Sequence, residues 1–136
     1  FEIKNKTNSS IRIIWDEAAF VDETGNSTRV LNGEMSYANR NNPIPPSGIV
    51  RKGSFSNIIV PSDNLYFSSG VGVNILPIFK NEFSDPIEAE KFGKELVGKT
   101  IQVLLPLEIE GVTNDYIFVF KIDDYTAEEV TTSIWY

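Results

Sequence analysis

The sequence predicts an all-β domain, an antiparallel sandwich that carries one short helix. Residues 10–22 alternate like a long strand and then change phase, turn residues recur at the intervals typical of sandwiches, and residues 101–122 have the pattern of a hairpin. The length of 136 residues suits one domain, which we expect to span residues 1–136 and to bury roughly two-thirds of the surface that the unfolded chain exposes.

Short paired strands are predicted at the start of the chain. Residues 1–5 alternate between apolar and polar side chains, and residues 10–15 do the same after a polar turn. Over residues 16–22 the apolar set slips to the other phase, so we expect a bend or a bulge there, as in strands that pass from one sheet toward another. The turn at residues 23–26 then returns the chain, and residues 28–31 are expected to complete a hairpin.

The middle of the chain is predicted to contain a loop, two strands and the helix. The prolines in residues 39–48 cannot donate to a central ladder, so we expect this loop to follow an edge or the surface. Residues 54–60 and 65–68 lie between turn residues and are predicted strands. Asp85-Pro86 predicts a helix near residues 86 to 97, because Asp is a favoured N-cap and Pro fits the first helical position. We expect this amphipathic helix to cover one open end of the sandwich.

A second hairpin is predicted near the carboxyl end. Residues 101–105 alternate, the loop at residues 111–115 reverses the chain, and residues 116–122 carry apolar side chains on both faces, which is typical of a central strand. Residues 131–136 also have strand propensity. Together the elements predict an immunoglobulin-like sandwich of about seven strands. Its expected core consists of Ile11, Ile13, Trp15, Ile59, Phe67, Val103, Leu105, Phe118 and Phe120.

The composition excludes several classes of chemistry. The chain has no histidine and no cysteine, so it lacks the residues for a Ser-His-Asp triad, a thiolate nucleophile, a Cys/His zinc site or an iron–sulfur cluster. Its formal net charge of −7 repels phosphate backbones and anionic lipids. No segment approaches the run of about 20 apolar residues that spans a bilayer. We therefore predict a protein that is not an enzyme, uses no cofactor and binds no nucleic acid.

Several local patterns have both a chemical and a plain structural interpretation. The acidic pairs that begin at Asp16, Asp22 and Asp123 contain the carboxylates that a glycosidase needs, but no spacing pairs them. Asp22–Asn26 and Asn114-Asp115 gather oxygen ligands suited to calcium, but neither matches an EF-hand. Arg40 precedes a PxxP pattern, which fits a polyproline ligand. Glycosylation sequons begin at Asn5, Asn8 and Asn26. In each case we favour ordinary turn residues and a loop stiffened by proline.

Aromatic residues offer one alternative function. Tyr37, Trp135 and Tyr136 could form a flat platform on which a sugar stacks, a use to which β-sandwiches are often put. Trp15 is in phase with Ile11, so we place it in the core instead. The alternative hypothesis is therefore a carbohydrate-binding module whose ligand contacts are Tyr37, Trp135 and Tyr136.

The order of residues also carries a family resemblance. It rests on Phe1-x-Ile3-x-Asn5-x-Thr7, on Ile11-x-Ile13-x-Trp15-Asp16-x-Ala18-x-Phe20-Val21-Asp22, on Pro45-Pro46-Ser47-x-Ile49, and on Leu104-Leu105-Pro106-Leu107-Glu108-Ile109. In these motifs, which are structural and not catalytic, the chain resembles small bacterial cell-envelope lipoproteins. More distantly, it is similar to the immunoglobulin-like sandwich of the water-stress and late-embryogenesis-abundant proteins.

The resemblance implies a non-catalytic, extracytoplasmic domain in the cell envelope that acts by protein contact or as a scaffold. Its partner would be an envelope protein or a glycan. Membrane attachment would come only through a lipid anchor on a removed N-terminal segment. Phe1 is not an initiator methionine, which fits such a removal, and the acylated cysteine of a lipoprotein is not in this chain.

Overall fold

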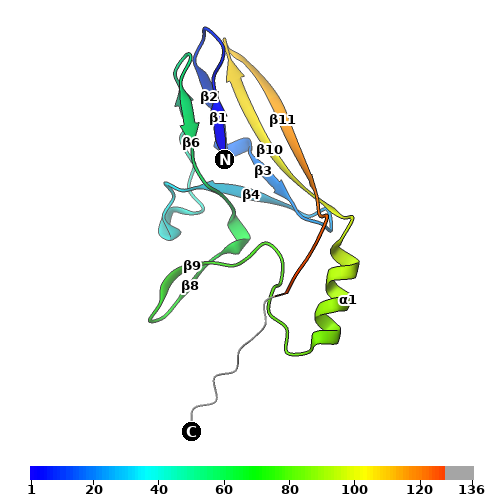
Figure 1. Cartoon of the computed structure of the whole chain (residues 1–136). Coiled ribbons are helices and arrows are strands. Elements are labelled where there is room, and N and C mark those ends of the chain that lie inside the picture. Colours follow the sequence, from blue (N-terminus) through cyan, green and yellow to red (C-terminus); the bar gives the residue numbers. More distant parts are fainter. Residues whose placement is uncertain (128–136) are drawn as a thin grey trace.

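Short antiparallel strands make up most of the regular structure, which a computed structural model describes for residues 1–127 (Figure 1). The elements are β1 Glu2–Lys4, β2 Ile11–Ile13, β3 Ala19–Val21, β4 Ser27–Asn32, β5 Ser47–Ile49, β6 Ser54–Ser56, β7 Ile59–Pro61, β8 Leu65–Ser68, β9 Gly72–Ile75, α1 Pro86–Leu96, β10 Thr100–Ile109 and β11 Val112–Lys121. The predicted all-β sandwich with one short helix is confirmed.

The large sheet is built around β10. This seven-stranded sheet has the order β5-β2-β10-β3-β4-β7, and β11 pairs with the opposite edge of β10. On the inner edge, Leu107–Ile109 pairs with β2 and Gln102–Leu104 pairs with β3. Every one of these pairings is antiparallel, so β10 connects strands from both ends of the described chain.

The predicted bend after the second strand is confirmed. Trp15–Glu17 forms a single 3₁₀ turn between β2 and β3. The strands before and after this turn both pair with β10. The chain therefore stays in one sheet, and the expectation that it passes toward a second sheet is wrong. A tight turn at Asp22–Asn26 then leads into the predicted hairpin of β3 with β4.

A ribbon of β1 and β6 forms the second layer of the sandwich. Ile3 and Phe55 lie opposite each other in this ribbon, and both pack against the core of the large sheet. The ring of Phe1 adds to the contact, with its centroid 6.2 Å from that of Trp15. The β8–β9 hairpin, in contrast, projects away from this body (Figure 1).

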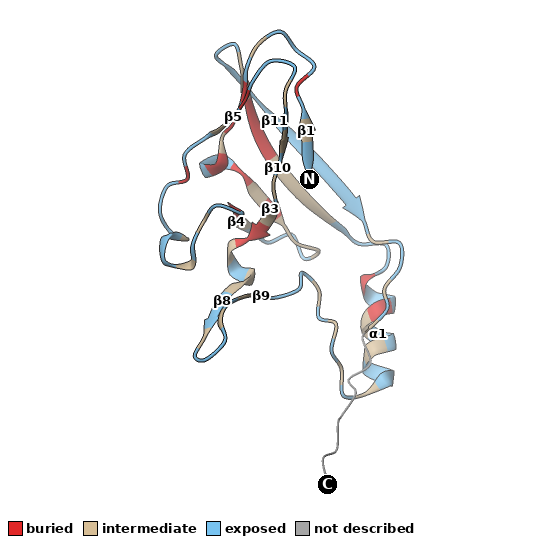
Figure 2. Ribbon diagram, turned by 60° about the vertical axis from the view of Figure 1, so that its left-hand side comes forward, coloured by how far each residue is buried: buried red, intermediate tan, exposed pale blue. Residues whose placement is uncertain are grey.

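The core lies where β2, β3, β4 and β10 meet (Figure 2). Of the predicted core residues, Ile11, Ile13, Trp15 and Leu105 are buried, and Ile59 and Val103 pack against them from partly buried positions. The indole N–H of Trp15 donates to Ser47 Oγ at 2.8 Å. The ring therefore buries its apolar surface without leaving its polar atom unpaired.

Three predicted core residues are exposed instead. Phe67 is 58% exposed, Phe118 is 45% exposed and Phe120 is 52% exposed. The prediction of a central strand at residues 116–122 is also wrong, because β11 has a paired neighbour on only one edge within residues 1–127. Apolar side chains on both faces fit a central strand, but alternation along one strand does not reveal whether a neighbour covers it.

The last hairpin is tighter than predicted. Glu110 and Gly111 alone make the turn, where residues 111–115 were expected to form a loop. Their φ angles are 53° and 77°, and a two-residue type I′ turn requires positive φ at both positions. Residues 112–115 consequently belong to β11, which gives that strand its ten residues.

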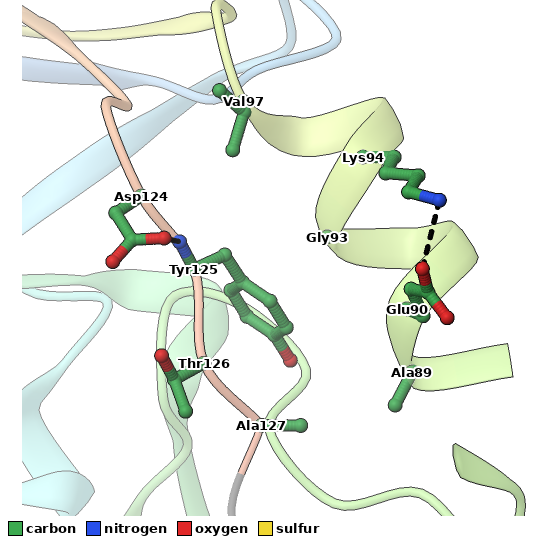
Figure 3. A pocket seen from close by; sticks show the side chains of 9 residues that line it. All are labelled: Ala89, Glu90, Gly93, Lys94, Val97, Asp124, Tyr125, Thr126 and Ala127. Atoms are coloured by element: carbon green, nitrogen blue, oxygen red, sulfur yellow. Dashed lines mark hydrogen bonds and ion pairs between the residues drawn. The ribbon is translucent and has the colours of Figure 1, made fainter. Parts of the chain in front are cut away.

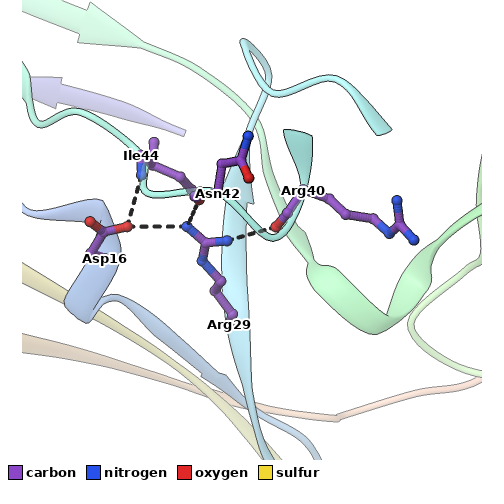
Figure 4. A network of polar contacts seen from close by, with 5 residues as sticks. All are labelled: Asp16, Arg29, Arg40, Asn42 and Ile44. Carbon is purple, nitrogen blue, oxygen red and sulfur yellow. Dashed lines mark hydrogen bonds and ion pairs between the residues drawn. The ribbon is translucent and has the colours of Figure 1, made fainter. Parts of the chain in front are cut away.

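One arginine fastens the proline-containing loop to the sheet (Figure 4). The Arg29 guanidinium, on β4, donates to the carbonyl of Arg40 at 2.6 Å and to that of Asn42, and it forms a 3.1 Å ion pair with Asp16. The Asp16 carboxylate in turn accepts the backbone N–H of Ile44 at 2.8 Å. Because Ile44 is buried, this predicted surface loop also contributes a side chain to the core.

The helix begins as its sequence predicts. The Asp85 carboxylate accepts the N–H of Ile87 at 2.9 Å, and Pro86 occupies the first helical position. α1 lies beside the open end of the β10–β11 hairpin, where β10 begins and β11 ends (Figure 1). Its buried Leu96 is not part of the main core cluster. The helix therefore packs at one end of the large sheet and contributes no residue to the main core cluster.

Asn5 joins the first turn to the end of β5. Its side chain is buried, and its Nδ2 donates to the carbonyls of Ser9, Ile49 and Val50 at 2.7 to 3.1 Å. Its Oδ1 accepts both the N–H and the hydroxyl of Thr7. Both ends of the amide are used, so this sequon serves as turn chemistry, as we had interpreted it.

Asn5→Asp is expected to lower the free energy of unfolding by more than about 3 kcal/mol, because a buried carboxylate would face three carbonyl oxygens without a donor. Urea denaturation followed by tryptophan fluorescence measures the change. Asn8→Asp makes the same chemical substitution at an exposed position of the same turn and should cost less than about 0.5 kcal/mol. Equal losses in the two variants would contradict the role of Asn5.

Leu105→Ala is expected to cost about 2 to 5 kcal/mol, because it empties a buried site. Phe118→Ala, on the neighbouring strand, should cost less than about 1 kcal/mol in dilute solution, because its side chain is exposed. Thermal and chemical unfolding at low protein concentration compare the two. A loss above about 2 kcal/mol for Phe118→Ala would show that its ring is covered.

Candidate functional site

The strand β11 is exposed along its whole length. All ten of its residues are exposed, and its apolar side chains keep between 42% and 59% of their accessible surface. Figure 2 shows this strand in the colour of exposed residues beside the partly buried β10. We call Asp115–Lys121, which contains five consecutive apolar residues, the β11 edge. Single exposed hydrophobic residues are common, whereas a contiguous apolar strip is typical of interaction sites and makes this edge a candidate.

The polarity of the free edge follows from Pro106. Pro106 lies opposite Asp115, has no N–H, and directs its carbonyl away from β11 to accept the N–H of Ile14 at 3.0 Å. The two residues therefore form a non-hydrogen-bonded pair, and the N–H and C=O of Asp115 point outward. Since this direction alternates along a strand, Ile117 and Val119 also present their backbone groups on the free edge.

The side chains of the β11 edge divide between two faces. Tyr116 and Phe118 lie opposite Leu105 and Val103, so they share the face that carries the core. With Phe120 they form an aromatic row at the rim of the core face, where each keeps 42% to 52% of its accessible surface. Ile117 and Val119 project from the other face. The edge thus offers backbone groups in its plane and apolar side chains above and below.

A charge stands at each end of the apolar run. Asp115 lies opposite Pro106 and Lys121 lies opposite Thr100, so neither charge meets an opposite charge across the hairpin. Among the ion pairs found within residues 1–127, none includes either side chain. Charged residues are one way in which proteins protect sheet edges. Here they flank five apolar residues without interrupting them.

A second apolar surface lies on the β8–β9 hairpin. Phe67, Val71, Val73 and Ile75 are each more than half exposed. This two-stranded hairpin projects from the body of the domain (Figure 1), and no third strand pairs with it within residues 1–127. An isolated two-stranded ribbon is marginally stable, so this hairpin is a less rigid platform than β11, which the whole sheet supports.

Tyr37, one of the three predicted ligand contacts, is already in contact with other side chains. The guanidinium carbon of Arg40 lies 3.7 Å from the centroid of its ring, and the ring of Phe67 lies 5.9 Å away, tilted by 36°. Arg40 therefore occupies one face of the ring on which a sugar would stack. The other two predicted contacts, Trp135 and Tyr136, lie outside the described residues.

A shallow pocket lies between α1 and residues 124–127 (Figure 3). The Tyr125 ring points from this segment toward the helix and approaches so closely that a Cβ at position 93 would lie 2.9 Å from its Cδ1. Gly93 is thus required for this contact, and burial raises the pKa of the Tyr125 phenol. The nearby Glu90 is paired with Lys94 at 2.8 Å, so the pocket presents no free pair of carboxylates.

The acidic residues serve local structure. Asp22 Oδ1 accepts the N–H and hydroxyl of Thr24 and the N–H of Asn26, and the hydrogen bond from the Thr24 hydroxyl is the main cause that lowers the pKa of this carboxyl. Asp16 is held by Arg29. Within residues 1–127, no three acidic side chains gather closely enough to hold a metal ion. These carboxylates close turns and fix a loop.

The β11 edge is a candidate contact surface that the sequence did not assign. Its apolar pattern predicts a buried central strand, and Asp115 was considered only within the Asn114-Asp115 calcium candidate. No helix among the described residues is long and apolar enough to cross a membrane. Comparisons with protein-family models, curated proteins and solved structures found no match to this chain.

Hydrogen exchange should reveal the alternating polarity of the free edge. In dilute solution, the amides of Ile117 and Val119 should exchange at least about 100-fold faster than those of Tyr116 and Phe118, whose N–H groups point toward β10. Residue-resolved NMR exchange measures these rates. Uniform protection along the strand in the dilute monomer would contradict a free edge.

Proposed function

We propose that this chain is the non-catalytic, immunoglobulin-like domain of a bacterial cell-envelope lipoprotein and that it acts by protein contact at the β11 edge. The observation that supports this proposal is the β11 edge, Asp115–Lys121, whose outward backbone groups and apolar side chains are both accessible. Its mode of binding is β-strand addition, in which a strand of the partner extends the large sheet.

The chemistry of the edge suits this mode. Outward N–H and C=O groups supply main-chain hydrogen bonds to an added strand, and alternating side chains supply specificity. The run Tyr116–Phe120 contains two phenylalanines and a tyrosine, and aromatic residues are enriched at protein interfaces. A partner strand would also cover apolar surface that is otherwise exposed to water.

The proposed location rests on the sequence. The resemblance to cell-envelope lipoproteins supports a location outside the cytoplasm, and the formal net charge of −7 disfavours electrostatic binding to anionic lipid. A separate lipid anchor would then hold the domain at the membrane while leaving its surface free. The absence of histidine and cysteine from the sequence fits a role in binding.

Site-specific photocrosslinking in cells tests the contact. A photoreactive amino acid at Ile117 should give a discrete covalent protein adduct, because this side chain would lie inside the proposed contact. The same group at Ile87, an exposed apolar residue on α1, is the control and should give none. The adduct at position 117 should disappear when Val119→Pro removes an outward N–H of the edge. Absence of any protein adduct at position 117 would contradict the proposal.

A glycan array distinguishes the carbohydrate-binding alternative. We expect no bound glycan. Specific binding that is lost in Tyr37→Ala or Trp135→Ala and retained in Ile117→Ser would instead assign the function to the aromatic residues.

A further inference from the structure

We propose that the partner of the β11 edge is the β11 edge of a second copy, paired antiparallel about a two-fold axis at Phe118. This inference rests on the proposed function, in which the β11 edge is the contact strand. Closed two-fold dimers are the commonest homo-oligomers, and their interface joins one surface patch to itself. The β11 edge must therefore be complementary to its own reversed sequence.

The polarity of the edge limits the registers that can form. Asp115, Ile117, Val119 and Lys121 are the residues that point their backbone groups outward, so a partner strand must place outward residues opposite outward residues. Two-fold antiparallel pairing meets this condition only when the axis passes through a residue and not between two residues. The available registers are consequently few, and each can be compared by the side chains that it brings together.

A two-fold axis at Phe118 gives the register in which both charged residues, Asp115 and Lys121, are paired. Asp115 then lies opposite Lys121 of the second copy, and Lys121 lies opposite Asp115. Between these ion pairs, Ile117 lies opposite Val119, so each copy exchanges main-chain hydrogen bonds there. An axis at Ile117 would set Asp115 against Val119, and an axis at Val119 would set Lys121 against Ile117. Opposite charges directly across a ladder are favourable, whereas a charge against an apolar residue is not paired.

The same register joins the two aromatic rows. Phe118 lies opposite Phe118 of the second copy, and Tyr116 lies opposite Phe120, on the face that carries both cores. These are the non-hydrogen-bonded positions, at which facing Cα atoms approach to about 4.5 Å and side chains contact most closely. The rims of the two core faces thus meet and form one continuous apolar face. A single sheet runs through both copies.

Reversing the charges of Asp115 and Lys121 tests the register. Asp115→Lys and Lys121→Asp each place like charges opposite each other in a homodimer, at two symmetric positions. A mixture of the two variants restores opposite charges at both positions in the heterodimer, and the Asp115→Lys/Lys121→Asp double variant restores them in the homodimer. Glu95→Lys and Lys91→Asp make the same changes in net charge at exposed positions of α1 and serve as matched controls.

Sedimentation equilibrium of the full chain measures the association. At about 0.15 M salt, which screens net charge over about 8 Å, the wild type should shift from 15.3 kDa toward twice that mass with increasing concentration. Each single reversal on β11 should raise the dissociation constant at least about tenfold, and the mixture and the double variant should recover most of the loss. The α1 controls should behave as the wild type.

A disulfide reports the register directly. The chain contains no cysteine, so Phe118→Cys introduces a single thiol at the axis, where a Cα separation of about 4.5 Å suits a disulfide. Oxidised Phe118→Cys should form covalent dimers at least about tenfold faster than Phe120→Cys, whose thiols would lie several residues apart.

The outcomes separate this inference from the proposed function. A wild type that stays monomeric up to about 0.2 mM would overturn the dimer. If the adduct at position 117 then has the mass of a different protein, contact at the β11 edge survives with another partner. The Phe118 register would be overturned if Asp115→Lys left the dissociation constant of the dimer unchanged. It would also be overturned if the mixture of the two single variants did not regain the wild-type association.

Discussion

The double pairing of β10 is the constraint on which the rest of the structure depends. One edge of β10 holds β2 and β3 in succession, and the other holds β11. Pro106 is tolerated in the middle of this strand because its position requires no N–H toward β11 and its carbonyl is used by Ile14. The same position fixes which residues of β11 direct their backbone groups outward. Pro106 thus determines both the hydrogen bonding inside the sheet and which backbone groups of β11 are free at its edge.

Polar side chains hold the irregular segments in place around this sheet. Arg29 joins the proline-containing loop to Asp16, Asn5 joins the first turn to the end of β5, and Trp15 is fixed by Ser47. In each case the chain has few backbone partners, so a side chain supplies the hydrogen bonds that a ladder would provide elsewhere. The strands are short, and these contacts give the connections between them a defined geometry.

Local patterns predicted the fold class, the helix at Asp85-Pro86, the bend after Trp15 and four buried core residues. These features depend on residues that are close in sequence. The exposure of Phe118 and Phe120 depends on whether another strand lies beyond β11, and that neighbour is decided by the pairing of segments far apart in the chain. The candidate contact surface was missed for the same reason, since apolar residues on both faces fit a central strand and a binding edge equally well.

The pairing of Ile13 with Leu107 also sets the order in which the domain can form during synthesis. Because a ribosome releases the amino-terminal segments first, β2 and β3 leave it before β10 does, and the turn that carries Trp15 lacks its contacts with β10 during that interval. The β10–β11 hairpin is local and closes within about microseconds once it is released. The final strands therefore complete the core, and the nascent chain is most susceptible to aggregation before they emerge.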